Sequence, residues 1–492
     1  MSFTSVFHVK EHVLDGSHIR EFPRALSRSQ DDVLKLAVKE YIPKDNPSPK
    51  PGDVTIIGAH ANGFPKVRRR RPVHHLSPTV PSSCPLHLDK PKLPLPYISL
   101  TLALKRPLTV PPLKELYEAL WQDLHAESLK PSSTFRIRSI IIADAAWQSA
   151  SAALNEPLLG NDPGWFDHPR DLLHLINTLR PPRPLVGIGH SFGGSAIANV
   201  ALINPRLFSA IVLLDPVISK WSSNAKGTIE SSPAAASARR RDLWPSRAAA
   251  RAAFLKSPFY RAWDPRVFDA WLHHGLRDLP TQLYPTATPE AADGAAAIAS
   301  EKDRAVTLAT TKHQEVFTYF RPSWDAYDAA GREIVRPDLV PDIDPGLNES
   351  YFTFPVYRSE GASTLARLPQ LRPRVLYVFG GASDLSTPDL REEKMQLTGT
   401  GVGGSGGAAR GKVKEVTLPG AGHLFPMEVP GTSAELSAGW IEEALADWRA
   451  EQADYERWTR LSVAEKTTLT DEWIKRLGGS ARSPKAKAKA KI

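Results

Sequence analysis

Apolar stretches recur along the chain and alternate between the pattern of buried strands and that of helices. Continuous apolar runs bounded by turn residues are typical of strands that are buried on both faces. Residues 171–180 and 195–202 instead carry the spacing of helices. Such strand–helix–strand repeats predict an α/β fold with a mostly parallel central sheet that helices cover on both sides. The predicted strands are residues 54–59, 137–143, 185–189, 210–214, 374–381 and 413–418.

Two regions depart from this alternation. Residues 5–9 and 34–41 alternate apolar and polar positions, which predicts antiparallel strands at one edge of the sheet. Residues 217–371 are rich in Ala, Arg, Trp and Pro and show helical spacing only in places. Because this segment separates two sheet strands, we interpret it as a helical cap over the strand ends. The predicted core therefore has two parts, 1–216 and 372–477, followed by a disordered basic tail, 478–492.

Residues 67–113 fit neither pattern. They contain ten prolines, a run of four arginines and one acidic residue. A long segment without structural periodicity is unusual inside a compact domain. We interpret it as a disordered insertion, with a retained intron as one explanation and a genuine surface loop as the alternative. A second irregular stretch, the glycine-rich residues 399–411, lacks the GK[ST] ending of a phosphate-binding loop and is interpreted as a flexible linker.

The net charge of +9 first suggests a polyanionic partner. Residues 67–113 hold eight lysines and arginines against one aspartate, and residues 481–492 hold five more basic residues. The remaining body of the protein is therefore mildly acidic. This distribution argues against a nucleic-acid-binding face on the folded core.

The cysteine content and the distribution of apolar residues lead to expectations about the compartment and about membrane association. Cys84 is the only cysteine, so no disulfide can form within the chain and a reducing compartment fits. Residues 1–20 contain no apolar segment of a secretory signal, and no run approaches the roughly 18 apolar residues of a membrane span. We therefore expect a protein that is not secreted and does not span a membrane.

The stretch Gly187-Ile-Gly-His-Ser-Phe-Gly-Gly194 is the first candidate for chemistry. It lies between a predicted strand and a predicted helix, which is the context of the G-x-S-x-G nucleophile elbow. Glycines beside Ser191 leave room for a strained turn that exposes the hydroxyl. The alternative is an ordinary glycine-rich turn with an inert serine.

A serine nucleophile needs a histidine base, and that base needs an acid. His423 follows the last predicted strand, where this layout places the base. Two aspartates compete as the acid: Asp384 at the usual position, and Asp215 at the end of the strand after the elbow. Asp144 also ends a strand but precedes the nucleophile, which makes it the weaker candidate.

The oxyanion of such a reaction needs two N–H donors. One is expected from the backbone of Phe192, directly after the nucleophile. The second is expected from the loop His60-Ala-Asn-Gly63, where Ala61 or Asn62 could present its N–H. The alternative reading of this loop is a tight turn without function.

Taken together, these motifs resemble the fungal α/β hydrolases of toxin and secondary-metabolite biosynthesis, among them the peroxisomal acyl-CoA hydrolase of mycophenolic acid biosynthesis and the AK-toxin hydrolases. The likeness also covers residues 11–21, 213–216, 244–247, 263–266 and 418–425. It implies an α/β-hydrolase fold. It further implies Ser191 as nucleophile, Asp215 as acid and His423 as base, with Asn62 and Phe192 at the oxyanion positions. Asp384, which some relatives lack, leaves the acid open.

The resemblance also suggests an interpretation of residues 67–113 and of the C-terminal tail. In such relatives the His60 motif runs directly into the helix that begins near Glu115, which strengthens the interpretation of 67–113 as an insertion. The C-terminal Ala490-Lys491-Ile492 is similar to the S-K-L address read by the peroxisomal import receptor. Peroxisomal localisation is therefore expected, with the cytoplasm as the alternative.

The predicted function is a serine hydrolase that cleaves an acyl thioester or ester and uses no metal or redox cofactor. A small-molecule substrate is the expected partner, and a homodimer is the oligomer we consider. Arg239–Arg241 and Arg247 are either a solvated basic face or contacts for the phosphates of CoA. The alternatives are an esterase acting on an ester without CoA, and a catalytically silent binding protein on the same fold.

Overall fold

The computed structural model describes residues 3–63, 113–220, 232–285, 304–331, 333–340 and 358–479. The predicted insertion, apart from Leu113, and the tail from residue 480 onward lie outside these ranges. Among the described helices, none is long and apolar enough to cross a membrane.

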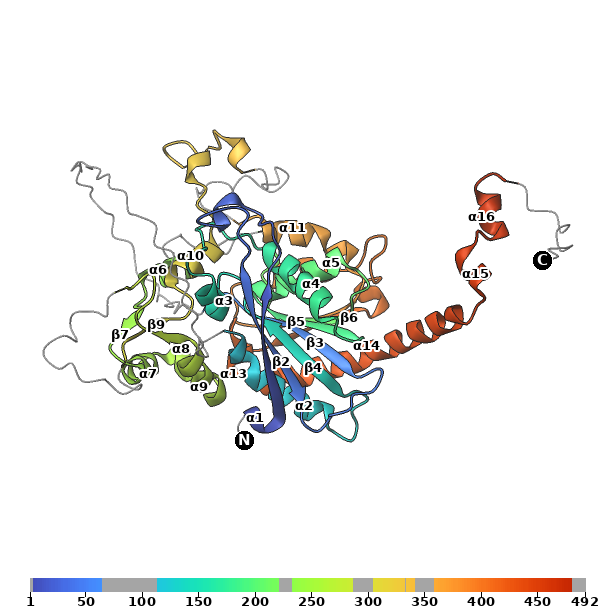
Figure 1. Cartoon of the computed structure of the whole chain (residues 1–492), viewed down its shortest axis with the longest axis horizontal. Coiled ribbons are helices and arrows are strands. Elements are labelled where there is room, and N and C mark those ends of the chain that lie inside the picture. Colours follow the sequence, from blue (N-terminus) through green and yellow to red (C-terminus); the bar gives the residue numbers. More distant parts are fainter. Residues whose placement is uncertain are drawn as a thin grey trace, which may run out of the picture.

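An eight-stranded sheet lies at the centre of the molecule (Figure 1). Its strand order is β1-β2-β4-β3-β5-β6-β10-β11. The pairs β1–β2 and β2–β4 are antiparallel and every other pair is parallel, so the mostly parallel sheet with an antiparallel edge is confirmed. The prediction of the first strand at 5–9 is too early, since residues 3–6 form a helix and the strand continues to Asp15. The strands are β1 Phe7–Asp15, β2 Lys35–Pro43, β3 Val54–Ala59, β4 Ile137–Ala143, β5 Leu185–His190, β6 Phe208–Leu214, β10 Arg374–Gly380 and β11 Val413–Leu418.

Neighbouring residues of a strand point to opposite faces of the sheet. Since apolar residues lie on both faces, helices cover the sheet on both sides. Ile56 and Val212 face a core that is shared with α2 (Glu118–Ser128) and α14 (Pro430–Thr459). Ile57 and Leu213 face a second core that is shared with α4 (Asp167–Leu179) and α5 (Phe192–Ile203). The central strands are therefore buried on both sides, as their continuous apolar runs predict, whereas the edge strands β1 and β11 are partly exposed.

Between β6 and β10 the chain forms helices and a small antiparallel sheet of order β7-β9-β8. Buried aromatic residues of this segment, including Trp244 and Trp271, continue the core on the α2 side. Its elements are α6 Pro233–Arg239, β7 Leu243–Trp244, α7 Arg247–Leu255, α8 Pro258–Arg261, α9 Pro265–His274, β8 Leu276–Asp278, β9 Val306–Leu308, α10 Lys312–Tyr319 and α11 Glu360–Arg367. The other helices are α1 Phe3–Val6, α3 Ser149–Leu154, α12 Pro388–Leu397, α13 Phe425–Glu428, α15 Val463–Thr467 and α16 Asp471–Arg476.

The C-terminal arm, residues 453–479, extends away from this body (Figure 1). The buried residues of α14 end at Leu445, and α15 and α16 have none. Several large apolar side chains of the arm are exposed, among them Trp458, Val463 and Trp473. This arrangement leaves apolar surface without a partner in the described chain.

The glycine-rich residues 399–411 are not a featureless linker, so that interpretation is wrong. Backbone N–H groups of Gly399 and Gly401 donate to the carbonyls of Leu368 and Pro369, both at 2.9 Å. Gly406 also donates to Gly399, at 2.8 Å. The glycines permit this close folding, since several of them have positive φ angles.

Candidate active site

Ser191 occupies the sharp turn between β5 and α5. Its φ of 57° and ψ of −120° are strained for a residue with a side chain, and its N–H is fixed by the carbonyl of Leu214 at 2.9 Å. A Cβ atom on Gly189 would lie 2.3 Å from the Gly193 carbonyl oxygen, and one on Gly193 would lie 2.2 Å from the Ala59 carbonyl oxygen. Only glycine fits at both positions. Steric restriction therefore explains the two glycines of the predicted elbow.

The structure brings Ser191 together with His423 and Asp215. His423 lies in the loop after β11, and its Nε2 is 2.8 Å from Ser191 Oγ. Its Nδ1 is 2.6 Å from Oδ2 of Asp215, at the end of β6. Since an ionised carboxylate can only accept, Nδ1 carries the imidazole proton and Nε2 is left to accept from the serine hydroxyl.

Asp215 is fully buried, and the loop after β10 supplies most of its other donors. Ser383 Oγ donates to Oδ2 at 2.5 Å, Ser386 Oγ donates to Oδ1, and the Gly380 N–H lies 3.4 Å from Oδ1. Burial alone would raise the pKa of Asp215. The hydrogen bond and the charge of His423, together with the hydrogen bonds from Ser383 and Ser386, outweigh burial and lower the pKa of Asp215 below its usual value.

Asp384, the other candidate acid, lies in the same loop between those two serines. Its side chain is exposed and, within the described ranges, makes no hydrogen bond with His423. Asp144 is buried elsewhere, where Lys114 Nζ donates to it at 2.8 Å. The geometry therefore supports Asp215 among the three aspartates.

The two expected oxyanion donors differ in how they are held. Phe192 is the first residue of α5, so its N–H has no acceptor within the helix. In the His60–Gly63 loop the Ala61 N–H already donates to Tyr117 Oη at 2.9 Å. The Asn62 N–H has no acceptor in the described part of the chain. Of the two alternatives, Asn62 is thus the one whose N–H is not taken by another described residue.

The side chain of Asn62 attaches this loop to α10. Its Oδ1 accepts from Gln148 Nε2 at 2.7 Å, and its Nδ2 donates to the carbonyl of Glu315 at 3.3 Å. Gln148 in turn donates to Thr318 Oγ1 at 3.3 Å. The segment between β6 and β10 therefore touches the oxyanion loop directly.

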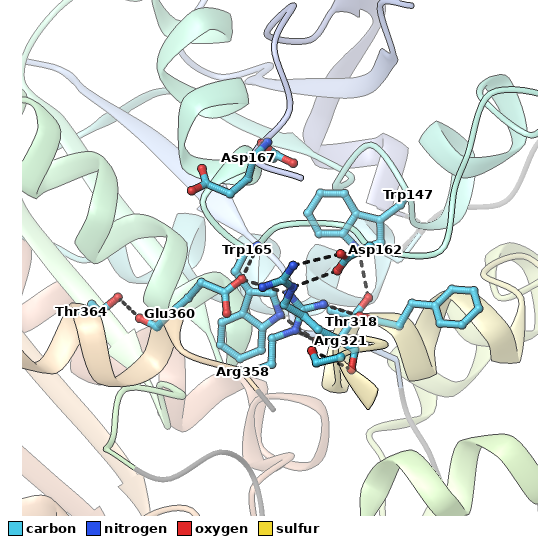
Figure 2. A network of polar contacts seen from close by, with 12 residues as sticks. Trp147, Asp162, Trp165, Asp167, Thr318, Arg321, Arg358, Glu360 and Thr364 are labelled. Atoms are coloured by element: carbon cyan, nitrogen blue, oxygen red, sulfur yellow. Dashed lines mark hydrogen bonds and ion pairs between the residues drawn. The ribbon is translucent and has the colours of Figure 1, made fainter. Parts of the chain in front are cut away.

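A buried network around Thr318 also holds α10 (Figure 2). Trp147 Nε1 donates to Thr318 Oγ1 at 2.9 Å, and Trp165 Nε1 donates to the Thr318 carbonyl at 2.7 Å. Arg358 also donates to that carbonyl and pairs with buried Glu360 at 2.9 Å. These contacts, with the Arg321–Asp162 pair at 3.0 Å, fix α10 between core loops and α11.

Two of the basic residues considered as CoA contacts, Arg240 and Arg247, are held by contacts within the protein, whereas Arg239 and Arg241 are exposed. Arg240 is paired with buried Glu315 at 2.6 Å. Arg247 donates to the Leu272 carbonyl at 2.9 Å and pairs with Asp278 at 3.0 Å. Neither is a simple solvated face. Among the described residues, no group of three His, Cys, Asp or Glu side chains is placed to hold a metal ion.

Sequence reasoning missed four residues of this site: Ser383, Ser386, Tyr117 and His190. The serines flank Asp384 in the sequence, and their spacing after a strand end could have indicated donors for a neighbouring carboxylate. His190 lies inside the elbow motif. Nothing in the sequence around Tyr117 indicates its contact with Ala61.

Comparisons with known proteins agree with this architecture. The profile of the alpha/beta hydrolase family matches residues 157–436. The chain is 37% identical to the type I acyl-CoA thioesterase mpaH of Penicillium roqueforti, over 91% of this chain and 90% of that protein. It is 38% identical to mpaH' of Penicillium brevicompactum with the same coverage, and 29% identical to the abhydrolase domain-containing protein AFT2-1 of Alternaria alternata over 60% of this chain and 98% of that protein.

Among solved structures, the peroxisomal alpha-beta-hydrolase Lpx1 of Saccharomyces cerevisiae is similar in fold. The TM-score is 0.58 at 14% identity, and the match covers 96% of each chain. The predicted fold and the resemblance to fungal hydrolases are both confirmed. On these grounds, the chain belongs to the alpha/beta hydrolase family.

Proposed function

We propose that this protein is a serine thioesterase that hydrolyses an acyl-CoA to the free acid and CoA. The observation that carries the proposal is the hydrogen-bonded series Ser191 Oγ, His423 Nε2, His423 Nδ1 and Asp215 Oδ2 on a nucleophile elbow. The choice of a CoA thioester rests on the relatives that are 37–38% identical and named as acyl-CoA thioesterases.

In the first half-reaction, Ser191 attacks the thioester carbonyl carbon while His423 Nε2 takes the hydroxyl proton. The carbonyl oxygen becomes an oxyanion that accepts hydrogen bonds from the N–H groups of Phe192 and Asn62. Each such donor contributes about 10²–10³ in rate. The C–S bond then breaks, and the imidazolium gives its proton to the leaving sulfur, which releases CoA as the thiol.

In the second half-reaction, a water molecule attacks the acyl-serine ester. His423 takes one water proton, the same N–H donors hold the second oxyanion, and Ser191 leaves with the proton from the imidazolium. Asp215 remains ionised throughout and stabilises the imidazolium form of His423. The lowered pKa of Asp215 is consistent with this role.

The test is a hydrolysis screen of acyl-CoAs beside p-nitrophenyl esters of the same acyl groups. We expect kcat/KM to be higher for the thioesters, and Ser191→Ala to lower it at least about 10⁴-fold. Ser195→Ala, which removes a buried hydroxyl four residues further along the turn and α5, is the matched control and should retain activity. An enzyme that cleaves only the esters is the esterase alternative, and binding without Ser191-dependent turnover is the silent binding protein.

We further propose that residues 217–371 act as a cap that selects the acyl group. Support comes from the hydrogen bond of Asn62 with the Glu315 carbonyl of α10, because a cap that touches the oxyanion loop borders the reacting carbonyl. The interpretation of 67–113 as an insertion remains a prediction from the sequence. Sequencing the transcript would contradict the intron explanation if codons 67–113 are present in the mature message.

Peroxisomal localisation is proposed from the sequence of Ala490, Lys491 and Ile492, which lie outside the described residues. A fluorescent reporter that carries the last twelve residues should collect in peroxisomes, and a diffuse cytosolic reporter would contradict this. The homodimer is proposed with some support from the C-terminal arm, whose exposed apolar side chains offer a surface for a second copy. Light scattering of the purified protein distinguishes dimer from monomer.

A further inference from the structure

A buried row of hydrogen bonds joins the oxyanion loop to the loop of the base. The Ala61 N–H lies 2.9 Å from Tyr117 Oη, and this hydroxyl lies 2.8 Å from His190 Nδ1. His190 Nε2 lies 2.9 Å from the backbone carbonyl oxygen of His423. Tyr117 is 2% exposed and His190 is fully buried, so both side chains are shielded from solvent.

The direction of every bond in this row is determined by its ends. The His423 carbonyl can only accept, so His190 Nε2 carries a proton. Burial lowers the pKa of His190 to about 3, so the ring is neutral and Nδ1 has a lone pair. Tyr117 must then donate its hydroxyl proton to Nδ1, and its oxygen accepts from the Ala61 N–H. With these directions, every donor in the row has an acceptor and every acceptor has a donor. Exchanging donor and acceptor in the bond between Tyr117 and His190 would leave a buried polar group without a partner.

His60 holds the next peptide of the same loop. Its Nδ1 lies 2.8 Å from the Ala61 carbonyl oxygen, and its Nε2 accepts from the Ala145 N–H at 3.0 Å. The Ala61 carbonyl and the Asn62 N–H belong to one planar trans peptide and point in opposite directions. Fixing that carbonyl therefore fixes the direction of the Asn62 N–H.

We propose that Tyr117 and His190 are positioning residues. They hold the oxyanion-binding N–H of Asn62 and the base His423 in a fixed position relative to each other. This inference rests on the proposed function. Tyr117 restrains one side of the oxyanion loop, and His190 restrains the backbone of His423. The row also passes beside Ser191, since His190 is its sequence neighbour. A single buried hydroxyl thus links the two parts of the machinery that must act on the same carbonyl group.

Tyr117→Phe tests this link with little change in packing, because the ring remains against Trp121. The variant leaves the Ala61 N–H without an acceptor and His190 Nδ1 without a donor. We expect kcat to fall about 10- to 100-fold while KM stays within about twofold, since a displaced oxyanion donor weakens transition-state binding more than substrate binding.

The matched control is Tyr377→Phe. Tyr377 is also fully buried and its hydroxyl bonds Thr398 Oγ1 at 2.8 Å, but it lies within the core on the α4 side and touches none of the catalytic groups. Both variants should lower the melting temperature, and only Tyr117→Phe should lower kcat. A merely structural role predicts equal kcat values for the two variants.

A second pair of variants tests His190. In His190→Gln the side-chain amide can still donate to the His423 carbonyl, whereas in His190→Ala both bonds are lost. We expect His190→Gln to keep a larger share of kcat than His190→Ala. Equal loss in both would contradict the role of the bond to His423.

All variants are also followed by the rate at which a fluorophosphonate labels Ser191, which needs the base and the oxyanion donors but no thioester. Slower labelling of Tyr117→Phe with normal labelling of Tyr377→Phe supports the inference even if no acyl-CoA is hydrolysed. Equal labelling and equal kcat in wild type and Tyr117→Phe overturn it and leave the proposed function standing. A wild-type protein that labels Ser191 but hydrolyses no thioester overturns only the proposed substrate class.

Discussion

Two neighbouring strands, β6 and β10, each end in a loop that carries an aspartate. Asp215, after β6, is fully buried and receives hydrogen bonds from His423, Ser383 and Ser386. Asp384, after β10, is exposed. The β10 loop thus supplies hydroxyl donors to the carboxylate that follows the neighbouring strand, and its own carboxylate is exposed.

The difference shows that the hydrogen-bond donors around a carboxylate, more than its position after a strand, determine whether it can act as the acid partner of the catalytic histidine. A buried carboxylate without donors would take up a proton and lose its charge. Asp215 keeps its charge because hydroxyl and imidazole N–H groups surround it, and burial then keeps its position fixed. An exposed side chain such as Asp384 has neither property.

Replacing Asp215 by Asn is expected to have the largest effect. The amide cannot stabilise the imidazolium and favours the tautomer of His423 that cannot accept from Ser191. Activity should fall about 10⁴-fold in kcat. Steady-state hydrolysis of the preferred substrate measures this, and a variant with more than a tenth of wild-type kcat would contradict the role of Asp215.

Removing both hydroxyls in Ser383→Ala/Ser386→Ala should have an intermediate effect. Each of the two charge-assisted hydrogen bonds is worth about 1.5 kcal/mol, a factor of about ten, so kcat/KM should fall by up to about 100-fold. Ser433→Ala/Ser437→Ala, which removes two buried hydroxyls from α14, is the matched control and should retain activity.

The same double variant makes a prediction for pH. A depressed carboxylate pKa contributes stability above the unfolded value, about 3.9, and that contribution is lost as pH falls through the folded value. Without the serines the pKa of Asp215 should rise toward its unfolded value. The free energies of unfolding of wild type and variant should therefore differ more at pH 7 than at pH 3.5, as denaturant titrations can measure. A difference that grows toward acid pH would contradict the assigned role of the serines.

Asp384→Asn should have the smallest effect. The exposed carboxylate has no bond to His423, so kcat and KM are expected to stay within about twofold of wild type. A loss comparable to that of Asp215→Asn in parallel assays would reverse the comparison and make Asp384 the acid.

The fold was largely predictable from the sequence. The run 137–143 matches β4 residue for residue, because burial on both faces leaves a strong pattern. Residues 413–418 also match β11, although this edge strand is only partly buried. The helix predicted at 171–180 begins four residues earlier, at Asp167, whose buried carboxylate accepts from the Glu21 N–H. That contact joins residues distant in the chain, and local spacing cannot indicate it.

The candidate site was predictable only where its residues lie in motifs. Ser191 and His423 follow from the elbow and from the last strand. The choice between Asp215 and Asp384 depends on three-dimensional contacts with Ser383 and Ser386. Tyr117 could not have been found, because its hydroxyl meets Ala61 across 56 residues, including the stretch outside the described ranges.

The most direct test of the account is peptide mapping of the fluorophosphonate adduct, with labelling rates measured in wild type, Asp215→Asn and Asp384→Asn. We expect a single adduct on Ser191, formed equally fast in wild type and Asp384→Asn and at least about 100-fold more slowly in Asp215→Asn. An adduct on another residue, or fast labelling of Asp215→Asn together with slow labelling of Asp384→Asn, would contradict it.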